Sequence, residues 1–304
     1  MKTPRRRRPS VAAVKHAQSS ANIRKTLEYW DGLSAFQKRL ELRSMRLPRC
    51  FYKYRAIPIV GDVEGRKRFE DLLLHNGLWM ADIATFNDPF EGSAAYEMPY
   101  TGPELRKKWE QKYRELGFSS ADARAMVKSE DVAHPERLLA RADGARKRAM
   151  SKMGMCALST NPSSPLLWAH YADSHKGLCV QLLPVADLRN LLAQKIEYSD
   201  TYPVLADMME PASDRNVLPM LRKSLDWAYE EEWRLVNLGQ VNYLQQVRPE
   251  AIGAVILGMR MSDADRAYVL DLMDQRQRRY GMRPVVFQAE RHPRRYRIRV
   301  RRCP

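Results

Sequence analysis

The stretch SPLLWAHYADSHKGLCV, residues 164–180, concentrates side chains that can bind ligands or move protons. Its pattern predicts a helix that continues almost to the glycine near its end. On such a helix His175 projects beside Trp168 and Tyr171, whereas His170 points about 140° away from that side. Two histidines five residues apart cannot bind one metal ion from a regular helix, so we expect no metal site built on this pair alone.

Because His175 falls in the last turn of that predicted helix, the helix C-terminus should favour its protonated form. A partly charged imidazole next to Tyr171 could bind a phosphate or carry a proton, and His170 is a second candidate for this role. The alternative is that these rings only pack beneath a sheet, as we expect for Trp168. Both histidines are therefore candidate catalytic residues, and Tyr171 is a candidate ligand-binding residue.

The segment FNDPFEG places Asn87, Asp88 and Glu91 on one short loop. Asn-Asp-Pro is typical of turns, and the polar side chains could simply close that turn. We expect Phe86 and Phe90 to anchor the loop to the core and thereby fix the positions of its polar groups. The three polar residues are therefore candidate ligand-binding residues.

A third group of functional side chains lies in the segment WAYEEEWRLV. If this segment forms a strand, Glu230, Glu232 and Arg234 share one face. Trp233 and Leu235 then point to the core from the other face. Carboxylates two residues apart on a strand are about 7 Å from each other, which suits hydrogen bonding to a ribose or general-base catalysis. Arg234 is a candidate ligand-binding residue, but it could equally neutralise the glutamates as a surface ion pair.

Arg55 ends the segment FYKYR, in which Phe51, Lys53 and Arg55 alternate with two tyrosines. The alternation and the aromatic content predict a strand. A guanidinium at the end of a strand offers a fork of donors to a phosphate or a carboxylate. Arg55 is therefore a further candidate ligand-binding residue.

The periodicity of the apolar residues predicts an α+β fold, with helices interleaved among the strands of a central mixed or antiparallel sheet. Strands are expected at 50–57, 78–83, 153–159, 178–183, 195–200, 230–237, 251–258, 284–289 and 295–302. Helices are expected at 23–46, 66–75, 164–177, 185–192, 215–228 and 262–278.

The chain is expected to form one domain with a leader and an insertion. Residues 1–22 are basic at first and then small and polar, which predicts a disordered leader. Residues 23–304 are expected to form a single α+β domain. A highly charged helical insertion interrupts it at about residues 102–150, between segments of the sheet.

The formal net charge of +16 is concentrated at the two ends of the chain. Residues 1–9 hold five positive charges and residues 291–304 hold seven arginines, and neither stretch contains an acid. Such ends could bind nucleic-acid phosphates in a salt-dependent manner. The alternative is a disordered leader together with a solvated edge strand whose arginines resist aggregation.

The sequence also predicts the cellular compartment of the protein. No run of about 18 apolar residues is present, so a membrane span is not expected. No apolar segment follows the basic N-terminus, which argues against export. The four cysteines are widely spaced and form no CxxC pair, which argues against a zinc site and suits a reducing compartment. We therefore expect a cytoplasmic protein with no membrane partner and no bound metal.

Four segments resemble, in the same order, the bacterial family named domain of unknown function 2971. They are FYKYR at 51–55, LWMADIATFNDPFEG at 78–92, CALSTNPSSPLLWAHYADSHKGLCV at 156–180 and WAYEEEWRLV at 227–236. The resemblance spans roughly residues 50–260, and NDPFE and WAHYADSHKG are its most specific motifs. It implies a bacterial protein but no particular activity.

The chain is also similar to ADP-ribosyltransferases, including DarT-type enzymes that modify DNA. The shared features are a basic residue on the first strand, an aromatic-rich middle segment and a late Glu-x-Glu strand. This resemblance implies that Arg55 holds a phosphate or ribose of NAD and that Tyr171 stacks on nicotinamide. It also implies that Glu232 or Glu230 aids the transfer. The Ser-Thr-Ser segment of such enzymes has no clear counterpart here, and NDPFE has no obvious counterpart in them.

These patterns lead us to expect an enzyme that uses NAD or another nucleotide, such as an ADP-ribosyltransferase-like effector in phage defence or a toxin system. A non-catalytic module that binds a nucleotide or nucleic acid is a second hypothesis for the same residues. A metal-dependent nuclease is a third, in which Asp88, Glu91 and Glu230 act with a histidine. The reading as one active centre requires the stretches around residues 55, 88, 170 and 232 to meet in one cleft.

Overall fold

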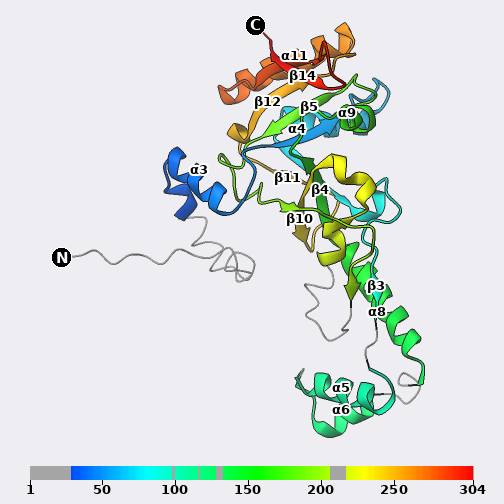
Figure 1. The fold of residues 1–304 in the computed structure, drawn as a ribbon. Coiled ribbons are helices and arrows are strands. Elements are labelled where there is room, and N and C mark those ends of the chain that lie inside the picture. Colours follow the sequence, from blue (N-terminus) through cyan, green and yellow to red (C-terminus); the bar gives the residue numbers. More distant parts are fainter. Residues whose placement is uncertain (1–28, 98–99, 116, 128–132, 206–216, 304) are drawn as a thin grey trace, which may run out of the picture.

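A ten-stranded mixed sheet runs through the computed structural model of the protein (Figure 1). The structure describes residues 29–97, 100–115, 117–127, 133–205 and 217–303. The strands of this sheet are β1 (Phe51–Arg55), β2 (Gly77–Asp82), β4 (Met153–Ser159), β5 (Leu178–Leu182), β6 (Gln194–Lys195), β10 (Glu232–Leu238), β11 (Tyr243–Gln246), β12 (Ile252–Leu257), β13 (Val285–Arg291) and β14 (Ile298–Arg302). The predicted α+β class with a central mixed sheet is confirmed.

Neighbouring strands follow the order β11, β2, β4, β1, β5, β12, β13, β14, while β10 also pairs with β4 and β6 pairs with β10. Within this sheet β12 and β13 are parallel, and the other pairs are antiparallel. Two small parallel sheets lie beside it. They pair β3 (Ala95–Tyr96) with β8 (Val204–Leu205), and β7 (Glu197–Tyr198) with β9 (Arg222–Lys223).

Helices cover both faces of the sheet. The α-helices are α3 (Ala35–Ser44), α4 (Val63–Leu73), α5 (Gly102–Glu115), α6 (Ser120–Met126), α8 (Pro135–Met150), α9 (Pro165–Tyr171) and α11 (Asp263–Tyr280). Short 3-10 helices are η1 (Ile83–Thr85), η2 (Leu218–Leu221), η3 (Leu225–Glu230) and η4 (Pro249–Ala251). Helices α4 and α11 contribute buried residues to one apolar cluster of the sheet, and α9 contributes to another.

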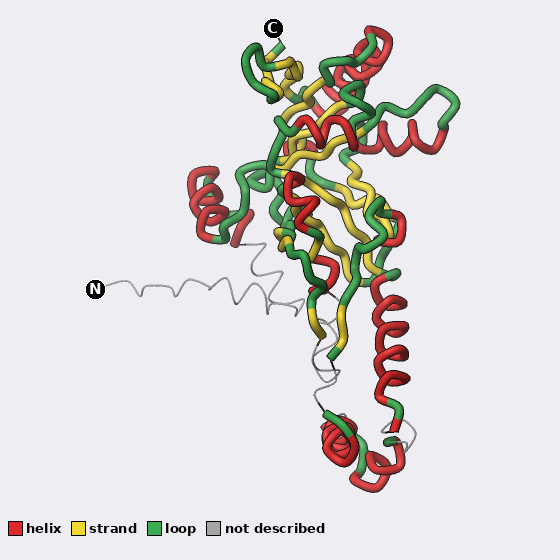
Figure 2. Tube along the Cα trace, turned by 45° about the vertical axis from the view of Figure 1, so that its right-hand side comes forward, coloured by secondary structure: helices red, strands yellow, loops and turns green. Residues whose placement is uncertain are grey.

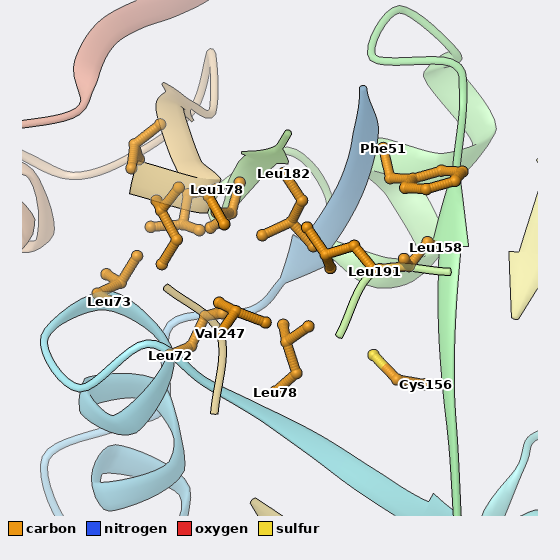
Figure 3. Close-up of a cluster of buried hydrophobic side chains, with 14 of the residues drawn as sticks. Phe51, Leu72, Leu73, Leu78, Cys156, Leu158, Leu178, Leu182, Leu191 and Val247 are labelled. Carbon is orange, nitrogen blue, oxygen red and sulfur yellow. The ribbon is translucent and has the colours of Figure 1, made fainter. Parts of the chain in front are cut away.

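The two faces are buried because the central strands are apolar on both sides. In β5, Leu178 and Val180 belong to the α4–α11 side, and Cys179 belongs to the α9 side. Figure 3 shows part of the first cluster, in which Leu72 and Leu73 of α4 lie beneath the strands. Burying one such side chain stabilises the fold by about 1.5–3 kcal/mol, so this layered core fixes the positions of the strands that carry the polar residues.

The charged segment at 102–150 is helical in its described parts, as expected. Helices α5, α6 and α8 project away from the sheet, with α5 and α6 at the far end (Figures 1 and 2). The root of α8 is fixed by Arg146, which is buried and donates hydrogen bonds to Asp143, to the hydroxyl of Tyr96 and to the carbonyl of Gly92. This contact joins α8 to the end of the NDPFEG loop.

Two of the predicted helices are wrong. Residues 185–192 form turns, because the carboxylate of Asp187 accepts hydrogen bonds from the backbone of Asn190 and of Arg248 in place of a helical pattern. The described part of 215–228 contains η2, β9 and most of η3 in place of one helix. Here Pro219 and the pairing of Lys223 with Tyr198 interrupt the helix that the local sequence suggests.

The two ends of the chain differ in how much of them the structure describes. The predicted leader, residues 1–22, and the basic stretch within it lie outside the described residues, as do residues 23–28 of the predicted first helix. The C-terminal arginine segment forms β14, which is an edge strand as expected. No helix in the described ranges has the length and apolar character needed to cross a membrane.

Candidate functional site

The central sheet divides beside β4. One edge of β4 pairs with β10 along its whole length. On the other edge β2 pairs at residues 154–155, and β1 pairs only at Ser159. In the described part of the chain, no strand pairs with residues 156–158 on that edge. Strands β1 and β2 therefore diverge from β4, and Lys53 bridges the resulting gap by donating from Nζ to the carbonyl of Ala157 at 2.9 Å.

A pocket of about 460 Å³ lies where the strands diverge. Its lining comes from β1, β2, β4, η1 and the loop after it, α9, β9 and the η3–β10 corner. The structure brings six of the ten candidate residues together in this lining: Arg55, Asn87, His170, Tyr171, Glu230 and Glu232. The stretches around residues 55, 88, 170 and 232 thus contribute to one cavity.

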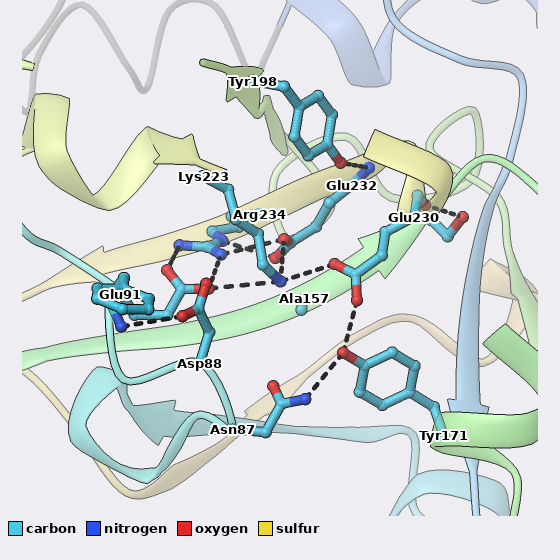
Figure 4. A network of polar contacts seen from close by, with 12 residues as sticks. Asn87, Asp88, Glu91, Ala157, Tyr171, Tyr198, Lys223, Glu230, Glu232 and Arg234 are labelled. Atoms are coloured by element: carbon cyan, nitrogen blue, oxygen red, sulfur yellow. Dashed lines mark hydrogen bonds and ion pairs between the residues drawn. The ribbon is translucent and has the colours of Figure 1, made fainter. Parts of the chain in front are cut away.

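Lys223 is the centre of a buried charge network (Figure 4), and it lines this pocket together with Glu230 and Glu232. Its Nζ lies 2.7 Å from Oε2 of Glu230, 3.4 Å from Oε2 of Glu232 and 3.5 Å from Oε1 of Glu91. Burial opposes its charge, but Glu232 and Glu230 more than offset this effect and raise the pKa of Lys223. The ammonium group therefore stays charged and holds the three carboxylates together.

Arg234 forms the second half of the network. Its guanidinium is fully buried and donates from Nε to Oε1 of Glu232 at 2.6 Å, and from its two terminal nitrogens to Glu91 at 2.6 and 2.8 Å. The ring of Phe86 lies 5.3 Å from the guanidinium carbon. With all groups ionised, the network carries one net negative charge, because it contains three carboxylates, of Glu91, Glu230 and Glu232, and two cations, Lys223 and Arg234.

The two pocket glutamates differ in their protonation chemistry. Burial raises the pKa of Glu230 above its ordinary value, and the contacts with Lys223 and Tyr171 only partly offset that effect. Burial acts in the same direction on Glu232, but Arg234 and Lys223 outweigh it and lower the pKa of Glu232. Glu232 therefore remains a partnered carboxylate, and Glu230 is the group better suited to exchanging a proton.

Tyr171 connects Glu230 to the loop of the NDPFE motif. Its hydroxyl donates to Oε1 of Glu230 at 2.6 Å and accepts from Nδ2 of Asn87 at 3.4 Å. Burial, followed by the contact with Glu230, raises the pKa of Tyr171, so the phenol remains protonated as a donor. Helix α9 and the loop therefore fix the carboxylate of Glu230 from the side opposite Lys223.

The β1 side of the pocket carries a positive charge without a carboxylate. Arg55 lines the cavity, and among the described residues it forms no ion pair and no side-chain hydrogen bond. Burial lowers the pKa of Arg55, and the nearby Arg68 adds to this effect. Arg68 itself lies over the ring of Trp79, 4.1 Å from its centroid, and Trp79 lines the pocket. This side is therefore suited to an anion.

Residues 160–163 connect the carboxylate side to the opposite edge of the sheet. Thr160 and Asn161 donate from their side chains to the carboxylate of Glu231, each at 2.9 Å. Two residues later, the carbonyl of Ser163 accepts a hydrogen bond from the backbone of Ile298 at the start of β14. One short segment thus contacts both the η3–β10 corner and the C-terminal strand.

His175 does not belong to the pocket, which contradicts its predicted role. Helix α9 ends at Tyr171, and His175 follows in the left-handed conformation with a φ of 71°. Its ring stacks against Trp168 with centroids 6.4 Å apart. Burial, together with the charge of Arg260, lowers the pKa of His175, so the neutral form is favoured instead of the protonated one. His170, by contrast, is exposed and lines the pocket.

Three other candidates support the site from behind. Asp88 accepts a hydrogen bond from the backbone of Phe90 at 2.9 Å and thereby closes its turn. This is the role considered above as the alternative to ligand binding. Glu91 and Arg234 bind each other, and their buried pair replaces the surface ion pair considered above. Phe86 packs on the core as expected, whereas Phe90 is 60% exposed and does not anchor the loop.

The strand prediction for 230–237 placed these side chains correctly although its start is different. Strand β10 begins at Glu232, and Glu230 ends η3. Glu231 between them is left-handed, with a φ of 45°. Leu235 is in the core and Trp233 packs against it, as expected.

Lys223 and Tyr198 were not anticipated from the sequence. Lys223 lies in a segment that reads as helical, and its two-residue strand β9 is defined only by pairing with β7. Tyr198 accepts a hydrogen bond from the backbone of Glu232 at 2.8 Å. The one available signal was that two glutamates share a face of the predicted strand with a single arginine, a surplus that a further cation would neutralise.

The hypothesis of a metal-dependent nuclease receives no support from this geometry. Glu91 and Glu230 already bind Lys223, and Asp88 binds the backbone of its own turn. No cluster of three or more potential metal ligands occurs among the described residues.

Comparisons of the chain with protein-family models, with curated proteins and with solved structures find no match. The resemblances to domain of unknown function 2971 and to ADP-ribosyltransferases therefore stay predictions.

Proposed function

We propose that the protein binds NAD in the divided sheet and transfers its ADP-ribose group to an acceptor. The observation that supports this proposal is the separation of charge in the pocket. Among the described residues Arg55 on the β1 side has no carboxylate partner, and the network around Lys223 has one negative charge in excess when all its groups are ionised. NAD has a matching pattern, because its diphosphate is anionic and its nicotinamide ring is cationic.

Aromatic walls between these two sides suit the flat rings of such a ligand. Tyr54, Trp79, Phe86 and Tyr171 all line the cavity. Aromatic side chains stack on planar heterocycles and bury them without requiring a matched set of hydrogen bonds. Arg55 would then bind phosphate oxygens with its fork of donors.

The proposed chemistry assigns the reacting group to Glu230. The bond between ribose C1′ and the nicotinamide nitrogen breaks, and its electron pair leaves with nicotinamide. An oxygen or nitrogen of the acceptor forms the new bond to C1′, and its proton passes to the carboxylate of Glu230. The excess negative charge favours the positive charge that develops on the ribose. The raised pKa makes Glu230 a stronger base than an ordinary glutamate.

A turnover assay with NAD labelled in the adenylate phosphate tests this proposal. The full chain is incubated with single-stranded DNA, RNA or a protein mixture, and free nicotinamide and transferred label are both measured. Glu230→Gln should lower both by about 10²–10⁴-fold, as expected for loss of a general base. Glu197→Gln is the matched control, because Glu197 is an exposed glutamate that forms a surface ion pair with Arg222 and does not line the pocket.

Two results would contradict the proposal. Full turnover by Glu230→Gln would remove Glu230 from the reaction. Saturable binding of NAD, with no nicotinamide release in the presence of any acceptor, would indicate that the protein is a binding module and not an enzyme.

A further inference from the structure

A second pocket, of about 400 Å³, lies on the sheet beside the first. Its floor crosses several strands, with Tyr52 on β1, Gln181 on β5, Ile256 on β12 and Phe287 on β13. Tyr52 also lines the pocket of the candidate site, so the two cavities are neighbours. Neither the proposed transfer chemistry nor the buried charge network makes use of this second cavity.

The rim of the second pocket is strongly basic. We define the arginine hairpin as residues 291–302, which comprise the end of β13, the connecting turn and β14. It contains Arg291, Arg294, Arg295, Arg297, Arg299, Arg301 and Arg302, all exposed. Within the described ranges only Arg301 has a carboxylate partner, Glu290 at 4.0 Å. Arg297 and Arg299 line the pocket itself.

The turn of the hairpin also presents an aromatic ring to solvent. Tyr296 is fully exposed and lies between Arg295 and Arg297. Because the exposed ring of Tyr296 buries no apolar surface, it adds no burial energy to the fold. Exposed aromatic rings next to arginines are the combination with which proteins bind nucleic acid strands, through base stacking and phosphate contacts.

We propose that the arginine hairpin and the second pocket bind a single-stranded nucleic acid. Arg294, Arg295, Arg297 and Arg299 contact phosphates, Tyr296 stacks on one base, and the pocket takes the next base against Phe287 and Tyr52. The partner is single-stranded because a duplex hides the ring faces that Tyr296 and the apolar pocket floor would contact. This assigns the C-terminal arginines to a site with a defined floor and rim.

The shared residue Tyr52 gives this surface a place in the proposed reaction. A strand bound along the hairpin would bring a base or ribose to the edge of the candidate site. The strand would then be the acceptor of ADP-ribose. That last step rests on the proposed function, whereas the binding of the strand does not.

Fluorescence anisotropy tests the binding without NAD. Fluorescein-labelled mixed-sequence 12-mers of DNA and RNA are titrated with the full chain at several salt concentrations. The double variant Arg297→Gln/Arg299→Gln should lose about tenfold or more in affinity at low salt. Its salt dependence should flatten by about 1.4 in the slope of log affinity against log salt, at ~0.7 per lost phosphate contact. Tyr296→Ala should lose at least about fivefold through the missing stack.

The matched control is Arg278→Gln/Arg279→Gln. It removes the same charge from exposed positions on α11, outside the hairpin and the pocket, and should bind like the parent protein. The basic N-terminus is common to all variants, so its contribution cancels. Circular dichroism checks the fold, and Arg294→Gln/Arg295→Gln replaces the first pair if that pair does not fold.

Three outcomes would overturn the inference. Equal losses in the hairpin variant and in its control would show a response to net charge alone. An unchanged affinity of Tyr296→Ala would remove the stacking contact. Equal competition by heparin or by duplex DNA would show a general polyanion surface. Because NAD is absent from this assay, its result stands apart from the fate of the transferase proposal.

Discussion

Arg234 and Arg299 lie on strands of the same sheet in opposite surroundings. Arg234 is fully buried and binds Glu91 and Glu232, whereas Arg299 is exposed and has no carboxylate partner among the described residues. Arg55 combines the two conditions, because it is largely removed from solvent and yet without such a partner. Whether an arginine maintains the fold or is available to a ligand therefore depends on whether its charge is paired with a carboxylate.

The largest expected effect is on Arg234. Arg234→Met leaves the carboxylates of Glu91 and Glu232 buried without their main cation, which should lower the free energy of unfolding by about 3–5 kcal/mol. Urea denaturation followed by circular dichroism measures it. Arg299→Met is the comparison on an exposed strand position. Equal losses in the two variants would contradict the distinction between buried paired and exposed unpaired arginines.

Arg55 should show the reverse of Arg234. Arg55→Gln removes a poorly solvated charge that pairs with no carboxylate within the described ranges, so stability should be unchanged or slightly higher. Binding of ADP-ribose, measured by isothermal titration calorimetry, should weaken by about 1.5–3 kcal/mol through the lost charged hydrogen bonds. Arg278→Gln, at an exposed position of α11 that does not line this pocket, serves as a control for charge alone and should bind ADP-ribose like the parent protein. A large loss of stability without a loss of affinity would mean that Arg55 is structural.

The two glutamates of the pocket should respond to pH with opposite signs. At neutral pH, Glu232→Gln should cost about 1–3 kcal/mol. Because the pKa of Glu232 is lowered in the fold, this advantage of the parent protein exists above the ordinary glutamate pKa and disappears as pH falls through the lowered value. The pKa of Glu230 is raised, so the parent loses stability relative to Glu230→Gln as pH rises through that value. Urea denaturation between about pH 2 and 8 follows both differences, and parallel curves would contradict the assignment.

The smallest effect is expected in the arginine hairpin. Arg299→Met and Arg302→Gln should change the free energy of unfolding by no more than about 0.5 kcal/mol, because these side chains are exposed and have no carboxylate partner in the described part of the chain. Thermal denaturation compares them with the parent protein. A loss comparable to that of Arg234→Met would assign the hairpin a role in the fold.

Sequence patterns predict the elements well where they depend on a single strand or helix. The apolar run at 153–159 identifies β4, and the alternation of Glu232, Arg234 and Leu235 identifies the correct faces of β10. They do not show which strands pair, so the gap beside β4 that forms the pocket was not visible. Nor did they reveal Lys223, whose position depends on a contact with β7. The misplaced His175 has a related cause, because the helical spacing continues past Tyr171 although the backbone turns left-handed at residues 173–175.

The segment at residues 160–163 could couple ligand binding in the two pockets. It holds Glu231 at one end and the backbone of Ile298 at the other, and Ser163 also borders the second cavity. A ligand that displaces this segment from one pocket would change the binding free energy of a ligand in the other pocket. If NAD and an oligonucleotide bind as proposed, linkage makes the effect reciprocal: the factor by which NAD changes the affinity for the oligonucleotide equals the factor by which the oligonucleotide changes the affinity for NAD.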